Sequence, residues 1–243
     1  MNELIHWEGM SKMIEVKNVV KRYRKVIALD EATFTAKEGR VTALLGINGV
    51  GKSTALKAIM GLIPINSGEI LIDGEPINHE VYNKIAMVPD VSTLFPHMTI
   101  EEAFEFMGIY YKNWDNEKAN RMLEFFKLTK DKKVNELSKG NKARVKLILG
   151  FGQKSKYLLL DEPFSGIDVF TREDFIGAMS GEFIEEGQGL IITTHEIGEI
   201  ENLAEDVVLL EEGRVIKQFS AEECREYFGK SIMDMMREVY RNA

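Results

Sequence analysis

The sequence predicts an α/β protein with a mixed β-sheet, an antiparallel β-subdomain near the N-terminus and an inserted α-helical subdomain. Short apolar runs at 41–45, 157–160 and 190–193 are typical of parallel strands that are covered on both faces. Residues 99–151 instead carry apolar side chains at three- and four-residue spacing, which indicates helices. A chain of 243 residues is close to the upper limit of a single hydrophobic core, so we expect one domain with a subdomain.

The individual elements follow from local patterns. Alternating and β-branched residues at 13–19 and 26–36 predict an antiparallel pair. Thr99 and Asp115 are suitable N-caps for two helices, and residues 211–213 predict the turn of a hairpin. We expect strands at 13–19, 26–36, 41–45, 69–73, 85–88, 157–160, 190–193, 206–210 and 214–219, and helices at 99–111, 115–127, 139–151 and 169–186.

This order of elements predicts four segments. Residues 1–12 form an N-terminal extension, and residues 13–90 together with 157–219 form a core that includes the antiparallel β-subdomain. Residues 91–156 form the helical subdomain, and residues 220–243 form two C-terminal helices. The last of these has an amphipathic pattern, and we expect it to pack on the core rather than bind a membrane.

Composition and charge limit the classes of function. The net charge of -8 and the isoelectric point near 5.2 argue against a nucleic-acid-binding surface. The single cysteine, Cys224, cannot form an internal disulfide and indicates no metal site, which fits a reducing compartment. No run approaches the eighteen or so apolar residues that a membrane span requires.

The segment Gly-Ile-Asn-Gly-Val-Gly-Lys-Ser-Thr at 46–54 carries the clearest chemistry. It follows a predicted buried strand and precedes a predicted helix, as a phosphate-binding loop of the P-loop NTPase type requires. Glycines let the backbone amides converge on a phosphate at the helix start. The lysine reaches the β- and γ-phosphates, and the serine hydroxyl coordinates magnesium. The predicted nucleotide-binding residues here are Gly46, Asn48, Gly49, Gly51, Lys52, Ser53 and Thr54.

A second motif, Tyr-Leu-Leu-Leu-Asp-Glu-Pro at 157–163, places two carboxylates after a buried strand. Parallel strands of open α/β sheets present their ligands at this end. We therefore predict that Asp161 holds the magnesium ion through its water shell and that Glu162 polarises the water that attacks the γ-phosphate.

Four further features of the sequence fit the same family of patterns. They are the loop Leu-Ser-Lys-Gly-Asn at 137–141, the segment Ser-Gly-Ile-Asp at 165–168, His195 after a predicted strand, and Tyr23 between the first two strands. With the two motifs above, they make the chain resemble the nucleotide-binding subunits of ABC transporters over 13–219. In this resemblance, 137–141 corresponds to the signature loop, Asp168 to the D-loop aspartate, His195 to the switch histidine and Tyr23 to the aromatic residue that stacks on adenine.

The resemblance implies an ATPase that uses ATP and Mg²⁺. It implies a head-to-tail dimer with a second nucleotide-binding subunit, identical or related, in which two ATP molecules are sandwiched. Ser138 is a suitable helix cap, so its hydroxyl and the Gly140 amide present an anion site; in the family this site holds the other subunit's γ-phosphate. Ser138, Lys139, Gly140 and Asn141 are therefore expected to act on the opposite subunit, with His195 contacting the γ-phosphate and positioning Glu162.

The resemblance also implies a membrane-spanning permease partner, docked on the helical segment 91–156 near 90–99. The chain would lie in the cytoplasm, peripheral to the inner face of the cell membrane. The pattern of variants resembles bacterial subunits tied to export. The alternative is a soluble ABC-type ATPase that acts on cytoplasmic machinery. DNA-repair relatives require long coiled-coil inserts and basic surfaces, and the sequence has neither.

Three positions depart from the family pattern. Asp90 stands where a glutamine usually contacts the magnesium shell; it is a candidate metal contact, and the alternative is a plain Pro-Asp turn. Lys139 replaces a glycine and Asn141 replaces a glutamine. Lys139 either faces the partner's phosphate or is a solvated helix-start residue, and the second interpretation is favoured.

Overall fold

The computed structural model describes residues 12–91, 96–181, 183–195 and 197–242. Residues 1–11 of the expected N-terminal extension and residues 92–95 of the expected docking region lie outside this description. The first strands form an antiparallel sheet in the order β2-β1-β4-β5. Its members are β1 (Met13–Tyr23), β2 (Val26–Lys37), β4 (Ser67–Ile72) and β5 (Glu75–Pro76).

A six-stranded sheet with the order β10-β9-β3-β8-β7-β6 forms the centre of the molecule. Its strands are β3 (Val41–Leu45), β6 (Ile85–Val88), β7 (Tyr157–Asp161), β8 (Gly189–Thr194), β9 (Asp206–Glu211) and β10 (Arg214–Ser220). All neighbours are parallel except the hairpin of β9 and β10. The sheet is therefore mixed, as the sequence predicts.

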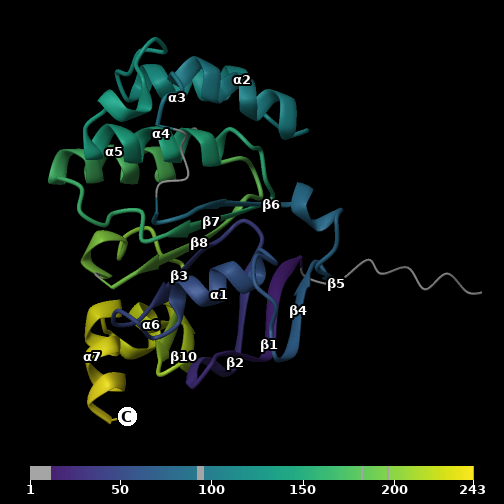
Figure 1. Cartoon of the computed structure of the whole chain (residues 1–243). Helices are drawn as coiled ribbons and strands as arrows, with labels where there is room; N and C mark the ends of the chain where they lie inside the picture. The colour runs from purple at the N-terminus through teal and green to yellow at the C-terminus, as the bar shows by residue number, and fades with distance from the viewer. Residues whose placement is uncertain (1–11, 92–95, 182, 196, 243) are drawn as a thin grey trace, which may run out of the picture.

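Successive residues of the central strands face two different cores, because side chains alternate across a sheet. Leu44, Leu159 and Ile191 pack with helix α1 (Lys52–Ile59) and the antiparallel sheet. Leu45 and Leu160 pack with the helices on the other face. Figure 1 shows α1 between the two sheets and the helical layer across the opposite face of the six-stranded sheet. This double coverage explains why the strand sequences are continuously apolar.

The helical layer consists of α2 (Ile100–Tyr110), α3 (Asn116–Phe125), α4 (Lys139–Phe151) and α5 (Val169–Ser180). The predicted cap residues are confirmed. The Thr99 hydroxyl accepts a hydrogen bond from the Glu102 amide in a capping box, and the Asp115 carboxylate accepts one from the Lys118 amide. Short 3₁₀ turns lie at Val81–Asn83, Val134–Glu136 and Ile197–Glu199.

The predicted helix at 169–186 was too long, because α5 ends at Ser180. The next residue, Gly181, has extended backbone angles of φ -118° and ψ -152°, and glycine weakens a helix through its conformational freedom. The strands predicted at 41–45 and 85–88 and the helix predicted at 139–151 have the observed bounds.

The chain ends in α6 (Ala221–Phe228) and α7 (Ile232–Asn242). Ile232 and Met235 are buried, so α7 packs on the core as predicted. Cys224 is 1% exposed, and burial raises the pKa of its thiol. None of the helices in the described ranges combines the length and the apolar character needed to span a bilayer.

Candidate nucleotide-binding site

Three parallel strands end at one edge of the six-stranded sheet and bring the predicted motifs together. β3 leads directly into the 46–54 loop, β7 ends at Asp161 and β8 ends at Thr194. The register pairs Leu45 with Thr194 and Asp161 with Thr193. Open α/β sheets bind ligands at this carboxyl edge, so the topology places the glycine-rich loop and the carboxylates where a phosphate ligand is expected.

The conformation of the 46–54 loop requires its glycines. Gly49 and Gly51 have φ values of 88° and 110°, a region that residues with a Cβ atom rarely adopt. A Cβ atom at Gly51 would lie 2.2 Å from the Ala28 carbonyl oxygen, and one at Gly46 would lie 2.4 Å from the Leu210 carbonyl oxygen. Positions 46 and 51 therefore have no room for a side chain, and the loop leads into the N-terminus of α1, where free amides favour an anion.

Lys52 is the first residue of α1 and is only 5% exposed. Its ammonium donates to the carbonyl oxygens of Gly46 at 2.6 Å and Ile47 at 3.2 Å, and it pairs with the Glu162 carboxylate at 3.1 Å. Three oxygen partners hold the charge inside the loop. Phosphate oxygens at this position would compete for the same donors, so the lysine is already placed for a triphosphate.

Ser53, Asp161 and Thr193 form a cluster of oxygen atoms beside this lysine. The Ser53 hydroxyl donates to Asp161 Oδ1 at 2.8 Å, and the Thr193 hydroxyl donates to the same oxygen at 2.9 Å. Asp161 is 3% exposed, so these bonds satisfy a buried carboxylate.

The oxygen cluster suits Mg²⁺, which needs few protein ligands, better than it suits a metal ion that is held by protein ligands alone. The described residues contain no group of three or more His, Cys, Asp or Glu side chains that could hold a metal ion. Mg²⁺ commonly takes only one or two protein oxygens and completes its shell with phosphates and water. A hydroxyl and a carboxylate at 2.8 Å from each other supply such a pair.

Glu162 follows Asp161 in a left-handed conformation with φ 45°, which is unusual for a residue other than glycine. Its amide donates to the Thr193 hydroxyl at 2.9 Å and to the Thr193 carbonyl oxygen at 3.2 Å. His195 Nδ1 lies 2.9 Å from Glu162 Oε2. The carboxylate is therefore held between a lysine and a histidine, and strained backbone of this kind is concentrated at functional sites.

The predicted signature loop begins α4. The Ser138 hydroxyl accepts a hydrogen bond from the Asn141 amide at 3.2 Å, as an N-cap should. A Cβ atom on Gly140 would lie 3.1 Å from the Thr171 hydroxyl and 3.5 Å from the Asp168 carboxylate. The loop thus packs against the start of α5 in the same chain.

Asp168 caps α5, and its carboxylate accepts hydrogen bonds from the Thr171 amide at 3.0 Å and hydroxyl at 2.7 Å. The bond from the Thr171 amide is the main reason that the pKa of this carboxyl lies below its usual value. The exposed Lys139 extends toward Gly166, where a Cβ atom would lie 1.9 Å from the lysine ammonium. Neither sequence interpretation of Lys139 included this contact, in which the solvated side chain covers Gly166 of its own chain.

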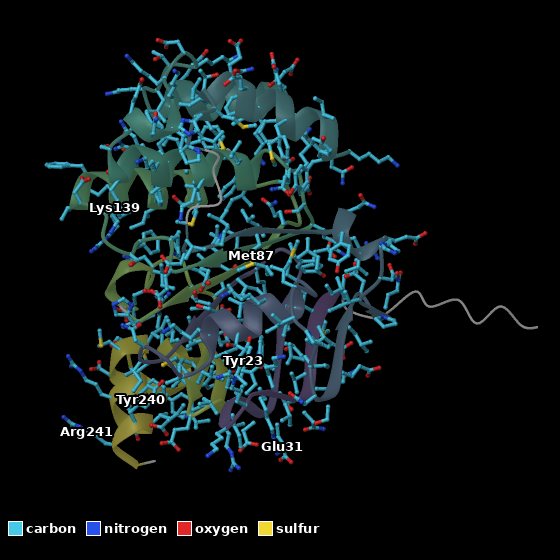
Figure 2. The ribbon with its side chains drawn as sticks, viewed as in Figure 1. Tyr23, Glu31, Met87, Lys139, Tyr240 and Arg241 are labelled. Atoms are coloured by element: carbon cyan, nitrogen blue, oxygen red, sulfur yellow. The ribbon has the colours of Figure 1, made fainter. Side chains whose placement is uncertain are left out.

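The remaining two predicted residues lie at the margin of this cluster. Tyr23 ends β1 and is 44% exposed, with the Lys21 ammonium 4.8 Å from its ring centroid. Figure 2 shows Tyr23 on the side of the antiparallel sheet and Lys139 at the start of α4. Asp90 is exposed, and its carbonyl oxygen accepts a hydrogen bond from Lys146 at 2.7 Å.

Two residues of this region were missed by sequence reasoning. The Thr193 hydroxyl donates to the Asp161 carboxylate and accepts a hydrogen bond from the backbone amide of Glu162. Its place at the end of a predicted buried strand, two residues before His195, was the available signal. Lys146 contacts the Asp90 loop from the middle of α4, and no local pattern in the sequence points to that contact.

Comparison with known proteins gives consistent matches. The family model described as ABC transporter matches residues 29–165. An uncharacterised ABC transporter ATP-binding protein of Bacillus subtilis, YhaQ, is 31% identical over 224 residues, which are 90% of this chain and 74% of that protein.

Two solved structures are also similar. One, described as the ATP-binding subunit of an ABC transporter, superposes with a TM-score of 0.83 at 28% identity and covers 94% of this chain and 99% of its own. The dimeric structure of the bacterial ABC transporter cassette MJ0796 superposes with a TM-score of 0.75 at 26% identity and covers 85% and 98%.

Proposed function

Because this chain belongs to the ABC transporter family of ATP-binding proteins, we propose that it binds Mg-ATP, hydrolyses it and supplies the energy for a membrane transporter. The observation that carries this proposal is the convergence of Lys52, Ser53, Asp161, Glu162 and His195 at one sheet edge. The start of α1, the end of β7 and the turn after β8 contribute to this cluster, and each side chain has a partner within it.

Nucleotide binding follows from the contacts of the loop. The amides at the start of α1 and the Lys52 ammonium bind the phosphates. Ser53 and Asp161 would hold a magnesium ion, and such an ion would supply positive charge next to the phosphate oxygens. When Lys52 turns to a phosphate, its pairing with Glu162 at 3.1 Å weakens, and the Glu162 carboxylate becomes available to a water molecule.

In hydrolysis, Glu162 accepts a hydrogen bond from the attacking water and orients it toward the γ-phosphate. His195 holds the other carboxylate oxygen at 2.9 Å, and Thr193 fixes the backbone of Glu162 through its hydroxyl. The base is therefore oriented by two neighbours on β8 and the turn after it, as preorganised catalysis requires.

The signature loop supports a head-to-tail dimer around two nucleotides. Ser138 and Lys139 are exposed at the start of α4, where a helix N-terminus favours a phosphate. Their hydrogen bonds in the described chain run within α4, and none reaches Lys52 or Ser53. A γ-phosphate bound to the loop of a second subunit is the ligand that we assign to this end of α4.

A cavity beside the helical layer supports docking of a membrane-spanning partner. It has a volume of about 310 Å³, and its walls come from β6, α2 and α4. Met87, Met98, Phe106 and Met107 are among the apolar side chains that line it. We propose that a cytoplasmic helix of the permease binds here, which places the chain in the cytoplasm on the inner face of the cell membrane.

Export is the proposed direction of transport. It rests on the resemblance of the Lys139 and Asp90 variants to those of bacterial exporting subunits. Assay of transport in inverted vesicles and in whole cells distinguishes the two directions once the substrate is known.

Phosphate release by the purified chain tests the proposal. We expect hydrolysis only with Mg²⁺, and we expect its rate to rise more steeply than the protein concentration because two subunits form one site. No release with Mg-ATP would contradict the ATPase assignment, and a purely monomeric mass under conditions of measurable turnover would contradict the dimer. Co-purification with a multi-span membrane protein supports the transporter role, whereas a soluble partner would favour cytoplasmic machinery.

A further inference from the structure

One lysine of the helical layer forms hydrogen bonds with the backbone of the loop that follows β6. Lys146 lies about two turns into α4, and its ammonium donates to the carbonyl oxygens of Pro89 at 2.8 Å and Asp90 at 2.7 Å. These two carbonyls belong to consecutive residues at the carboxyl end of the strand. A single side chain therefore fixes the backbone of this loop against the middle of α4.

The surroundings of Lys146 are apolar, yet its charge is compensated. The side chain lines the cavity of about 310 Å³, and it is the one charged group among the described lining residues. Burial lowers the pKa of Lys146, while the carboxylates of Asp90 and Asp161 act in the opposite direction. An ammonium in such a place needs its carbonyl and carboxylate partners, because an unpaired charge in an apolar setting is unfavourable.

The position of Lys146 connects three parts of the proposed site. Its helix starts at Ser138, the cap of the signature loop. Its hydrogen-bond partners follow β6, and β6 pairs in parallel with β7, so that Val88 lies beside Leu160 just before Asp161. Lys146 therefore connects α4 to a loop whose strand lies next to β7 and Asp161.

We propose that Lys146 is a positioning residue that fixes the Asp90 loop to α4 and so transmits the position of the helical layer to the magnesium site. This inference rests on the proposed ATPase function. It also accounts for the aspartate at position 90. The Lys146 ammonium holds the backbone of the loop, and its positive charge balances the negative charge of the Asp90 carboxylate. The competing explanation is a purely structural lysine whose loss changes only the stability of the fold.

A spin label on the Val91→Cys variant tests the contact without any nucleotide. Val91 is 67% exposed, whereas the native Cys224 is 1% exposed, so the label reacts at position 91. We expect Lys146→Met to increase the mobile fraction of the label at least about twofold, because both carbonyl bonds are lost. Lys146→Arg, which keeps the charge and the donors, should restore the ordered signal. Lys132→Met removes the charge of an exposed lysine in the connection between α3 and α4 and serves as the matched control.

Hydrolysis gives the second measurement. We expect Lys146→Met to lower kcat about tenfold, as small misplacements of reacting groups do, while its KM for ATP stays near the wild-type value. The melting temperature of Lys146→Arg should also stay near that of the wild type. Unchanged label mobility in Lys146→Met would overturn the inference. So would a loss of melting temperature with kcat unaffected, which is the structural outcome. Failure of the wild-type chain to bind ATP would instead remove the proposed function, and the label would still report on the loop.

Discussion

Two lysines at helix starts show how differently the two proposed phosphate-binding elements of this chain are built. Lys52 at the start of α1 is 5% exposed and bonded to three oxygens of its own chain. Lys139 at the start of α4 is exposed, and its ammonium extends over Gly166. Both helix N-termini favour an anion, but the lysine of the first is buried among oxygen partners and the lysine of the second is exposed.

The difference indicates where each element finds its phosphate. The loop at 46–54 is preorganised, so a triphosphate replaces contacts that already exist. The loop at 137–141 is organised against the D-loop, with Gly140 close to Asp168 and Thr171, and Ser138 and Lys139 are exposed. We interpret the first as a site for the chain's own ligand and the second as a site for a ligand held by another subunit. The following variants test this division.

The largest effect is expected for Glu162→Gln. The amide keeps the shape of the side chain but cannot take a proton, and general-base groups contribute about 10²- to 10⁴-fold to rates. We expect kcat to fall about a thousandfold while ATP binding is retained and a dimer accumulates in size-exclusion chromatography. Glu226→Gln, an exposed carboxylate on α6, is the control. Undiminished turnover in Glu162→Gln would remove this residue from the role of base.

Lys52→Ala should abolish high-affinity nucleotide binding. The variant loses the buried cation that the Gly46 and Ile47 carbonyls and Glu162 hold in place. We expect affinity for a fluorescent ATP analogue to drop about a hundredfold, equivalent to roughly 2.7 kcal/mol. Lys57→Ala, on the same helix and outside the loop, should bind as the wild type does. Equal affinity of the two variants would contradict the enclosed-site interpretation.

Sequence reasoning found the elements whose chemistry is local. The glycines and Lys52 of the phosphate loop are specified by strand, loop and helix in one continuous stretch, and β3 has its predicted bounds. The contacts of Thr193 with Asp161 and Glu162 were not predictable in this way, because they depend on β8 lying next to β7 in a parallel register.

Two other features differ from the sequence-based expectation, one for the same reason and one for a local reason. The ammonium of Lys139 lies over Gly166 only because α4 and the loop before α5 pack together, and the sequence pattern suggested a solvated residue or a partner contact. The helix predicted to continue to 186 ends at Ser180, since Gly181 lets the chain leave the helix. Long-range packing therefore decided the first outcome, and a local glycine decided the second.

Ser138→Ala tests the proposal that the loop at 137–141 binds a phosphate held by another subunit. Removing an N-cap hydroxyl costs about 1 kcal/mol of stability, and the proposed dimer also loses a donor to the opposite phosphate. We expect hydrolysis to fall about tenfold, in line with the loss of a charge-assisted hydrogen bond, while ATP binding to the monomer changes less than about twofold.

The matched control for this variant is Ser220→Ala. Ser220 caps α6 in the same way, by accepting a hydrogen bond from the Glu223 amide at 3.4 Å. Both variants should lose a similar few degrees of melting temperature. Equal hydrolysis by the two would show that Ser138 acts as a helix cap alone.

The smallest effect is expected at Tyr23, which lies outside both loops. Its ring is 44% exposed at the end of β1, a place where it can stack on the base of a nucleotide whose phosphates bind at 46–54. Stacking on an aromatic ring contributes about 1–3 kcal/mol, and a half-exposed ring belongs at the low end. We therefore expect Tyr23→Leu to weaken ATP binding about fivefold.

A comparison of two ligands separates stacking from a general loss of structure in Tyr23→Leu. Inorganic triphosphate has no base, so its affinity should be the same for the variant and the wild type, and only ATP should discriminate between them. Tyr227→Leu, which changes an aromatic residue of α6 that is 78% exposed, should affect neither ligand. Loss of affinity for both ligands in Tyr23→Leu would mean that the ring supports β1, and loss for neither would leave it a plain aromatic at the end of a strand.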